Sequence, residues 1–438
     1  MLLPPDMREW VADDDMVHFV IEAVEDMRLT TLKVNRRGSG SEQYPPKMML
    51  ALLIYCYANG IFSSRRIERA TYQHVSVRYL TADTHPDHDT ICTFRRENFE
   101  AIAQAFLHVL KIANAMNLVK VGTVSVDGTH IAANASKNRN VRYDRAGELE
   151  KQLKLDIAEL MTRAERADEQ DSDEGQRLPR QIARRENLAQ KMREAQERLE
   201  AQAKARAEAE RAEYERKLAE REKRKGIAKN HAPKPPKDTP PPEAQTNLTD
   251  GDSRLMRKTR RSAYTQSYNA QAAVDADSML ILSGHVTNCA SDANEMLPAV
   301  AAIPGELGKV EAVLADSGYV NADAIEQLEK QNVDVYVAVS RLENHDQRRY
   351  DFRPKSEPKP GRPIKDPRLL KMREKLQTDD GRRRYAKRKQ TVEPVFGVIK
   401  SVMGFRQFLL RGLEKVNGEW SLVRLAYNVK RLWRLQHA

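Results

Sequence analysis

The sequence lacks the features that mark secreted, disulfide-bonded or membrane-spanning proteins. Its 438 residues include three cysteines, Cys56, Cys92 and Cys289, which are odd in number and far apart. This pattern predicts neither a disulfide framework nor a zinc site, and it fits a reducing compartment. The most apolar run, from Met48 to Tyr57, is too short to span a bilayer. The short, acidic, proline-containing N-terminus is unlike a signal peptide. We therefore expect a cytoplasmic protein with no membrane partner.

Aromatic residues are also scarce, at 6% of the chain, whereas charged residues make up 31% and hydrophobic residues 40%. This composition supplies a core but leaves much of the chain for solvated helices or linkers. The 74 lysines and arginines outnumber the 63 aspartates and glutamates, so the formal net charge is +11. A basic surplus of this size favours nucleic acid as a partner, although a basic protein with no such partner also fits.

Residues 1–120 are predicted to be mostly helical. Helices are expected at about 46–60, at 64–73 and, with Asp89 as a cap, over 90–116. Four arginines are expected to be exposed there: Arg65, Arg66, Arg95 and Arg96. Short helices with exposed arginines suit a helix-turn-helix that binds DNA. A plain helical bundle with solvated arginines fits the same pattern.

The middle of the chain changes character twice. Residues 121–135 alternate β-branched with small or polar residues, which predicts a strand. The charged stretch that follows predicts two helices, at about 146–170 and 180–225, as a helical hairpin or coiled coil. Six prolines within 233–242 then indicate an extended linker.

Beyond residue 247 the pattern alternates between strands and helices, which is typical of an α/β fold. Helices are expected from Asp292, over Asn321–Gln331 and within 391–436. The expected strands are Tyr264–Ala273, Met279–Val286, 310–316 and 333–340.

Three acidic residues stand out by their context. Asp127 follows the strand residues TVSV and precedes Gly128, and Asp316 ends the strand VEAVLA and precedes SGY. Glu393 comes shortly after the stretch 381–390, which holds six lysines or arginines. A carboxylate at the end of a buried strand is costly unless protonation, a cationic partner or a metal compensates it. Each acid alone also fits a turn or cap residue, but their order along the chain predicts one site for metal-dependent phosphoryl transfer.

The chain resembles bacterial insertion-sequence transposases that carry a DDE site on an RNase H-like fold. The resemblance covers nearly all of the chain outside the charged stretch. It is carried by VDGTHIAANASKN (126–138), the segment 252–292, VLADSGYVNADAIEQL (313–328), the segment 385–420 and, in the helical region, 45–70.

The resemblance implies the roles of the three acids. In the family the first Asp lies on the first strand, the second on the fourth strand, and the Glu on a helix after the fifth strand. These positions correspond to Asp127, Asp316 and Glu393 in this sequence. The resemblance therefore implies that all three are catalytic and bind two Mg²⁺ or Mn²⁺ ions.

The family also has a Tyr-Arg-Glu-Lys signature around that Glu. Tyr385, Arg388, Glu393 and Lys400 match it, and the interval of six residues between Glu393 and Lys400 is kept. Four residues separate Arg388 from Glu393, where the family pattern has three, so Arg388 and Lys389 are both candidates for phosphate contact. Lys400, seven residues after Glu393, is expected on the same helix face.

Two further features near this signature have alternative interpretations. Pro394 is well tolerated in a first helical turn but would kink a helix if it lay deeper. Trp420 and the pair Phe405-Arg406 are candidates to stack on a DNA base, while a core role for Trp420 is the favoured interpretation.

The resemblance implies four parts. Residues 1–120 are the N-terminal helical domain, and 121–144 begin the RNase H-like catalytic domain. The charged hairpin and linker, 145–246, are an insertion, and 247–438 complete the catalytic domain. The fold class expected is therefore α/β, with a mixed sheet flanked by helices.

The function implied is Mg²⁺-dependent cleavage and strand transfer of DNA at the ends of an insertion sequence. The expected partners are element ends and target DNA, and a second copy of the chain as a homodimer on paired ends. A nucleoid-associated location follows from DNA as substrate. Two alternatives remain open: an RNase H-like nuclease without strand transfer, and a non-catalytic DNA-binding protein derived from a transposase.

Overall fold

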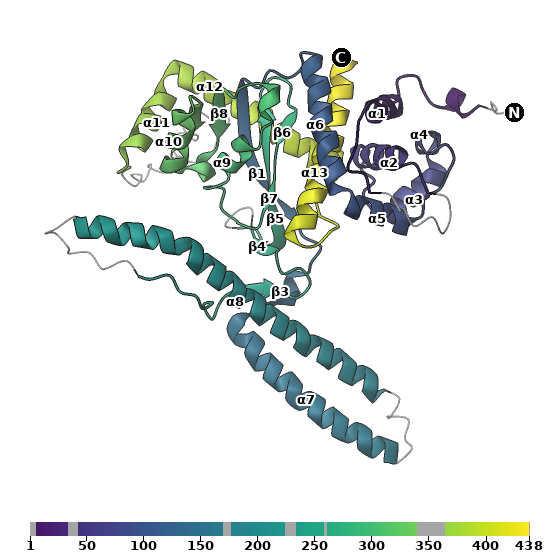
Figure 1. The fold of residues 1–438 in the computed structure, drawn as a ribbon, viewed down its shortest axis with the longest axis vertical. Helices are drawn as coiled ribbons and strands as arrows, with labels where there is room; N and C mark the ends of the chain where they lie inside the picture. The colour runs from purple at the N-terminus through teal and green to yellow at the C-terminus, as the bar shows by residue number, and fades with distance from the viewer. Residues whose placement is uncertain are drawn as a thin grey trace, which may run out of the picture. The chain divides into compact units, whose positions relative to one another are not determined.

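A computed structural model describes most of the chain (Figure 1). The described residues are 6–33, 43–169, 177–223, 234–257, 261–339 and 364–437. They fall into two compact units, one formed by Asn134–Gln266 and the other by the chain before and after that segment. None of the helices in these ranges is both long and apolar enough to span a membrane.

The N-terminal part of the first unit is helical, as expected. Its elements are η1 (Met7–Trp10), α1 (Met16–Glu25), α2 (Pro46–Ala58), α3 (Ser64–Gln73), α4 (Val75–Leu80), α5 (His88–Glu97) and α6 (Phe99–Ala115). The prediction of one helix over 90–116 is wrong, because the helix is interrupted at the buried Asn98. The Asn98 side chain accepts a hydrogen bond from Lys33 N. The predicted cap is also wrong: Asp87, not Asp89, accepts hydrogen bonds from the first turn of α5.

A mixed sheet forms the centre of this unit, which confirms the α/β prediction. Six strands of it are β1 (Thr123–Ala132), β5 (Thr265–Asp275), β6 (Ile281–Ser283), β7 (Val286–Thr287), β8 (Ala312–Ala315) and β9 (Asp334–Val337). β5 pairs antiparallel with β1 on one side, and β8 pairs parallel with β1 on the other. β9 extends the parallel side, whereas the short β6 and β7 pair with β5. The predicted single strand at Met279–Val286 is therefore two short strands, and Ser340 of the last predicted strand lies outside the described residues.

Helices flank the sheet (Figure 1). They are α9 (Met296–Ala301), α10 (Ala322–Lys330), α11 (Pro367–Gln377), α12 (Asp379–Gly397) and α13 (Leu413–Gln436), with the short 3-10 turns η4 (Gly305–Leu307) and η5 (Ser317–Tyr319). The α9 helix begins at Met296, so the predicted helix start at Asp292 is wrong. α13 is buried along most of its length and packs against α6 and α2. Trp420 on α13 is fully buried and donates to Gln271 O at 3.0 Å, which is the core role favoured for it.

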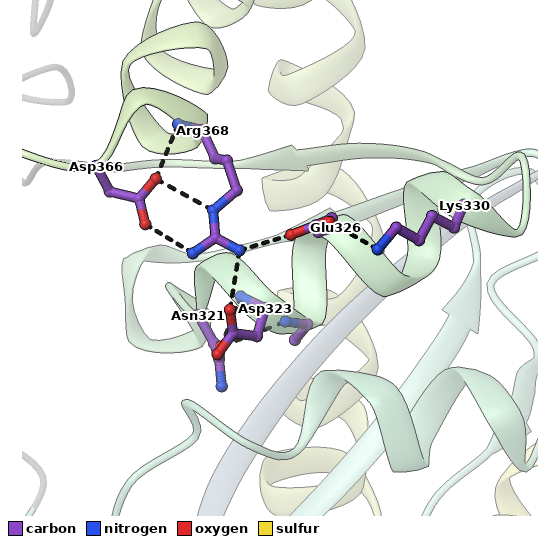
Figure 2. Close-up of polar contacts among 7 residues, drawn as sticks. Asn321, Asp323, Glu326, Lys330, Asp366 and Arg368 are labelled. Carbon is purple, nitrogen blue, oxygen red and sulfur yellow. Dashed lines mark hydrogen bonds and ion pairs between the residues drawn. The ribbon is translucent and has the colours of Figure 1, made fainter. Parts of the chain in front are cut away.

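Arg368 ties α11 to α10. Its guanidinium donates to Asp323 Oδ1 at 2.8 Å and to Glu326 Oε2 at 2.7 Å on α10, and it also pairs with Asp366 before α11 (Figure 2). Lys375 on the same helix pairs with Asp334 at the start of β9. These contacts hold α11 beside the parallel edge of the sheet, and α12 follows directly from it.

The second unit is dominated by two long helices, α7 (Tyr143–Glu169) and α8 (Leu178–Lys223), which pack against each other. The remaining elements of this unit are η2 (Lys137–Arg139), β2 (Asn140–Arg142), β3 (Gln245–Asn247) and β4 (Arg254–Met256). One buried cluster joins Val141 on β2 to Ala146, Leu153, Ala189, Met192 and Ala195 of the two helices, and a second pairs Leu160 with Leu178. Polar contacts accompany them, including a hydrogen bond of 2.7 Å from the Tyr143 hydroxyl to Glu200. Because the apolar contact between α7 and α8 is narrow, the two helices can pack together even though apolar residues are irregularly spaced along them.

Candidate active site

Asp127 lies in β1, two residues past its parallel pairing with β8, and Asp316 directly follows the last residue of β8. In the β1–β8 register, Ser125 lies opposite Leu314. Continuing that register by two residues places Asp127 opposite Asp316, at the strand spacing of about 4.8 Å. The first two predicted site residues are therefore brought together by the sheet itself.

Local structure fixes both side chains. The residues before Asp127 are buried, and Asp127 Oδ1 accepts from Gly128 N at 2.8 Å. Asp316 caps the turn η5, because its Oδ1 accepts from Gly318 N at 2.7 Å. Each carboxylate thus has a backbone amide on one oxygen, which leaves other lone pairs for a further ligand.

The third acid, Glu393, reaches this site through Arg388. Both residues lie on α12, where Arg388 Nη2 donates to Glu393 Oε1 at 2.9 Å. Arg388 Nη1 lies 3.5 Å from Asp127 Oδ2. The Arg388 side chain is 9% exposed, whereas that of Glu393 is 51% exposed. The guanidinium therefore lies between the first and third acids, with Glu393 on the open side.

The electrostatics of the cluster are unbalanced. Burial, followed by the charge of Asp316, raises the pKa of Asp127 from 3.8 to about 7, although Arg388 acts in the opposite direction. Burial disfavours the Arg388 charge, but Tyr385 and the carboxylates around it outweigh that effect, so the pKa of Arg388 is raised. Negative charge thus exceeds positive charge around Asp127, which favours an added cation.

Pro394 lies inside α12 rather than in its first turn. It is followed by a π-helical turn at Val398–Val402, which contains Lys400. Proline lacks the N–H that an α-helix requires and clashes with the preceding turn, so irregular helix is expected there. The turn interrupts the regular helical spacing between Glu393 and Lys400. Lys400 Nζ donates to Thr129 Oγ1 and, at 2.8 Å, to His130 O, both on β1 near Asp127.

The other predicted contacts differ in exposure. Lys389 is exposed and Tyr385 is half-buried on α12. Arg65 and Arg66 are exposed on α3, and Arg96 is exposed on α5.

The predicted exposure of Arg95 is wrong. Arg95 is 3% exposed, and its guanidinium donates to the Tyr57 hydroxyl at 2.8 Å and to Phe62 O at 3.0 Å. Its side of α5 faces α2 and α3, so this arginine belongs to the packing of the helices.

Two family models match the chain. The one described as "Transposase DDE domain" matches residues 241–429, which include Asp316 and Glu393. The one described as "Transposase domain (DUF772)" matches residues 5–97. The chain belongs to the DDE transposases of insertion sequences. No curated protein and no solved structure matches it. Asp127 lies between the two matches, so its place in the site comes from the sheet register and its contact with Arg388 rather than from either match.

Membership in this family identifies the chain as a transposase, a nucleic-acid-processing enzyme with DNA as its substrate. Such transposases typically use a divalent metal. In the described part of this transposase, no three Asp, Glu, His or Cys side chains are grouped closely enough to hold a metal ion. The donor types nevertheless fit a hard divalent cation, because the site offers carboxylate oxygens with excess negative charge. Glu393, exposed and bound to Arg388, would have to rotate to join Asp127 and Asp316.

The sequence interpretation misses one acidic residue of this transposase. Asp292 is predicted only as a helix start, but its Oδ1 accepts from Asn269 Nδ2 and Gln271 Nε2, each at 2.7 Å. Its charge also contributes to the raised pKa of Asp127, after the larger effects of burial, Asp316 and Arg388. The available signal was the pair of amides, Asn269 and Gln271, two residues apart in the buried strand β5.

Proposed function

We propose that this transposase carries out Mg²⁺-dependent DNA cleavage and strand transfer at the ends of an insertion sequence, with Asp127, Asp316 and Glu393 as its catalytic carboxylates. The observation that carries this proposal is the register of β1 and β8, in which Asp127 and Asp316 both lie two residues past the last parallel pair, Ser125 and Leu314. The contact of Arg388 with both Asp127 and Glu393 adds the third acid to the same place.

The strand order supports an RNase H-like core. A long strand, β1, has an antiparallel neighbour on one side and two parallel strands beyond its other side. Functional side chains gather where such parallel strands end. We infer that the segment between β1 and β5, with its charged helices α7 and α8, is an insertion into this core.

Asp127 and Asp316 would bind the cations from the sheet, and Glu393 would bind them from α12. Bound divalent cations activate an attacking oxygen and stabilise the leaving oxygen of a phosphodiester. Arg388, released from Glu393, is placed to hold a DNA phosphate beside the carboxylates, as is the exposed Lys389. Tyr385 and Lys400 would position the same DNA strand, and Lys400 is itself anchored on β1.

The N-terminal helices would supply most of the DNA affinity. Arg65, Arg66 and Arg96 are exposed on α3 and α5, and such side chains bind phosphates irrespective of sequence. Arg95, buried against Tyr57, would hold the helices in place. A homodimer on paired DNA ends and association with the nucleoid complete the proposal.

The test is cleavage of DNA that carries both flanks of the reading frame. The wild type should cut it only with Mg²⁺ or Mn²⁺. The variants Asp127→Ala, Asp316→Ala and Glu393→Ala should bind the same DNA and leave it uncut. Cleavage by any of the three at the wild-type rate contradicts the proposal.

A second assay separates the two alternatives. End-labelled element DNA is incubated with plasmid target, and joined products are measured. Joining supports a transposase reaction, whereas cutting without joining identifies a nuclease. DNA binding with neither activity identifies a non-catalytic derivative.

A further inference from the structure

A fourth carboxylate lies beside Asp127 and Asp316. A Cβ built on Gly128 would lie 2.7 Å from Asp292 Oδ1, and a Cβ built on Gly318 would lie 3.3 Å from Asp292 Oδ2. The same Gly318 position is 2.9 Å from Asp316 Oδ1. Asp292 therefore lies against the residue that follows Asp127 and against the turn that Asp316 caps.

Amides on β5 hold this carboxylate in place. Asn269 Nδ2 and Gln271 Nε2 both donate to Asp292 Oδ1 at 2.7 Å. Gln271 is itself fixed, since its Oε1 accepts from the buried Tyr319 hydroxyl and its main-chain oxygen accepts from Trp420. Within the described ranges, Asp292 Oδ2 has no hydrogen-bond donor, so one oxygen is anchored while the other is available.

A second observation at the same place points to a ligand. Asn269 is 1% exposed, and its Oδ1 has no hydrogen-bond partner among the residues that the structure describes. That oxygen lies 2.8 Å from the Cβ position of Gly128, beside Asp292 Oδ1. A buried acceptor without a donor is rare and costly. A hydrated cation would supply both a countercharge for the carboxylates and water hydrogens for Asn269, because Mg²⁺ keeps several of its waters when bound.

We propose that Asp292 is a fourth carboxylate of the divalent-cation site, and that rotation of these side chains from the spacing seen here lets it bind the cation together with Asp127 and Asp316. Asn269 holds Asp292 through Nδ2 and receives a water of the hydrated cation on Oδ1. Any side chain at Gly128 would enter this space, which explains the glycine there. The inference rests on the proposed function, because Asp127 and Asp316 supply the remaining charge.

The test uses Mn²⁺ alone, without DNA, on the full-length chain. Free Mn²⁺ is measured by electron paramagnetic resonance for the wild type, Asp292→Asn, Asp127→Asn and the control Asp277→Asn, which changes an exposed carboxylate just beyond β5. The Asp292 and Asp127 substitutions should each weaken Mn²⁺ binding at least about tenfold. The control should change it less than about twofold.

The outcomes separate the two proposals. If Asp127→Asn weakens binding and Asp292→Asn behaves as the control, the role of Asp292 is overturned while the proposed function stands. If the wild type itself binds no Mn²⁺, both fail. A variant that loses thermal stability but binds Mn²⁺ normally when folded shows that Asp292 only anchors its loop, which also overturns the proposal.

A measurement on the unaltered protein covers the case in which Asp292→Asn does not fold. Fe²⁺ with ascorbate and peroxide cuts the backbone close to a bound ion, and mass spectrometry locates the cuts. Cuts should appear near residues 127, 292 and 316 and should disappear with excess Mg²⁺. Cuts near 127 and 316 without any near 292 overturn the inference.

Discussion

Two clusters in this transposase combine a buried arginine with carboxylates, and they differ in how the charge is balanced. In one, Glu419 on α13 is fully buried and accepts from Leu409 N at 2.9 Å, from Leu410 N at 3.0 Å and from the Tyr57 hydroxyl at 3.4 Å. Arg95 donates to the same Tyr57 hydroxyl. In the other, Arg388 lies among Asp127, Asp316 and Glu393.

The causes of the pKa shifts show what this difference means. Burial raises the pKa of Glu419, and every other influence on it, led by Arg95 and the two amides, favours its charge. Burial also raises the pKa of Asp127, but there the next largest influence is another carboxylate, Asp316, which raises it further. The first cluster is closed and links the N-terminal helices to α13. The second has excess negative charge and an open side, as expected for a site that binds a cation.

The largest expected effect comes from removing charge in the open cluster. Asp127→Asn should lower DNA cleavage at least about a thousandfold, roughly 4 kcal/mol of barrier, because a cation ligand is lost. The same change should leave the melting temperature unchanged or higher without metal, because it relieves repulsion with Asp316. Cleavage rates and thermal unfolding check both results. A large loss of stability in Asp127→Asn would show that this carboxylate, like Glu419, stabilises the fold.

Removing the carboxylate of the closed cluster should mainly affect folding. Glu419→Ala leaves Arg95 buried without its countercharge and two amides without acceptors, so the free energy of unfolding should fall by about 3–5 kcal/mol. Tyr57→Phe, which removes one hydroxyl, should cost about 1 kcal/mol. Chemical denaturation measures both, and a cost below about 1 kcal/mol for Glu419→Ala contradicts the structural role.

Stability should depend on pH through Asp127. Its pKa is 3.8 when unfolded and about 7 when folded, so the folded state keeps a proton that the unfolded chain releases. The resulting stabilisation is fully present below pH 4 and is lost as the pH rises through 7. The free energy of unfolding without metal should fall by a few kcal/mol at most over that interval, since a tenfold difference in proton affinity corresponds to about 1.4 kcal/mol.

Asp127→Asn isolates this effect, because its unfolding free energy should lack that part of the pH dependence. Excess Mg²⁺ should reduce the fall in the wild-type unfolding free energy as the pH rises, since a bound cation stabilises the ionised carboxylate. If the unfolding free energies of the wild type and the variant change in parallel between pH 4 and 7, the pKa of Asp127 is not raised in the folded state.

The smallest expected effect concerns exposed arginines. Arg65→Ala with Arg66→Ala should weaken DNA binding by about 1–2 kcal/mol and reduce the slope of log affinity against log salt by roughly 2, without changing stability. Arg95→Ala should instead destabilise the fold, because Arg95 belongs to the closed cluster. Fluorescence anisotropy over a range of salt concentrations measures the first effect. Unchanged binding in the double variant would place the DNA contacts elsewhere.

Much of the fold follows from local patterns in the sequence. The alternation around Asp127 predicts β1, and the apolar stretches after residue 247 predict the α/β order. The break at Asn98 was missed because it depends on a hydrogen bond from Lys33, far away in the sequence. The burial of Arg95 depends on packing against Tyr57 and was likewise invisible in the pattern.

The candidate site was predictable in its strand residues and less so in its helix. Asp127 lies in β1 and Asp316 follows β8, and the parallel pairing of these strands brings them together. The bond between Arg388 and Glu393, and the π-helical turn after Pro394, depend on three-dimensional packing and backbone strain. Asp292 was missed because it lies in a loop after β7, while its partners, Asn269 and Gln271, lie on β5, about twenty residues earlier in the sequence.

The central claim is that the open cluster gathers divalent cations, and a crystal soaked in Mn²⁺ tests it most directly. Anomalous scattering should show Mn²⁺ bound directly to carboxylate oxygens of both Asp127 and Asp316, with Glu393 turned away from Arg388 toward the ion. A crystal at saturating Mn²⁺ with no anomalous peak at these oxygens, and with Glu393 still bound to Arg388, would contradict the account.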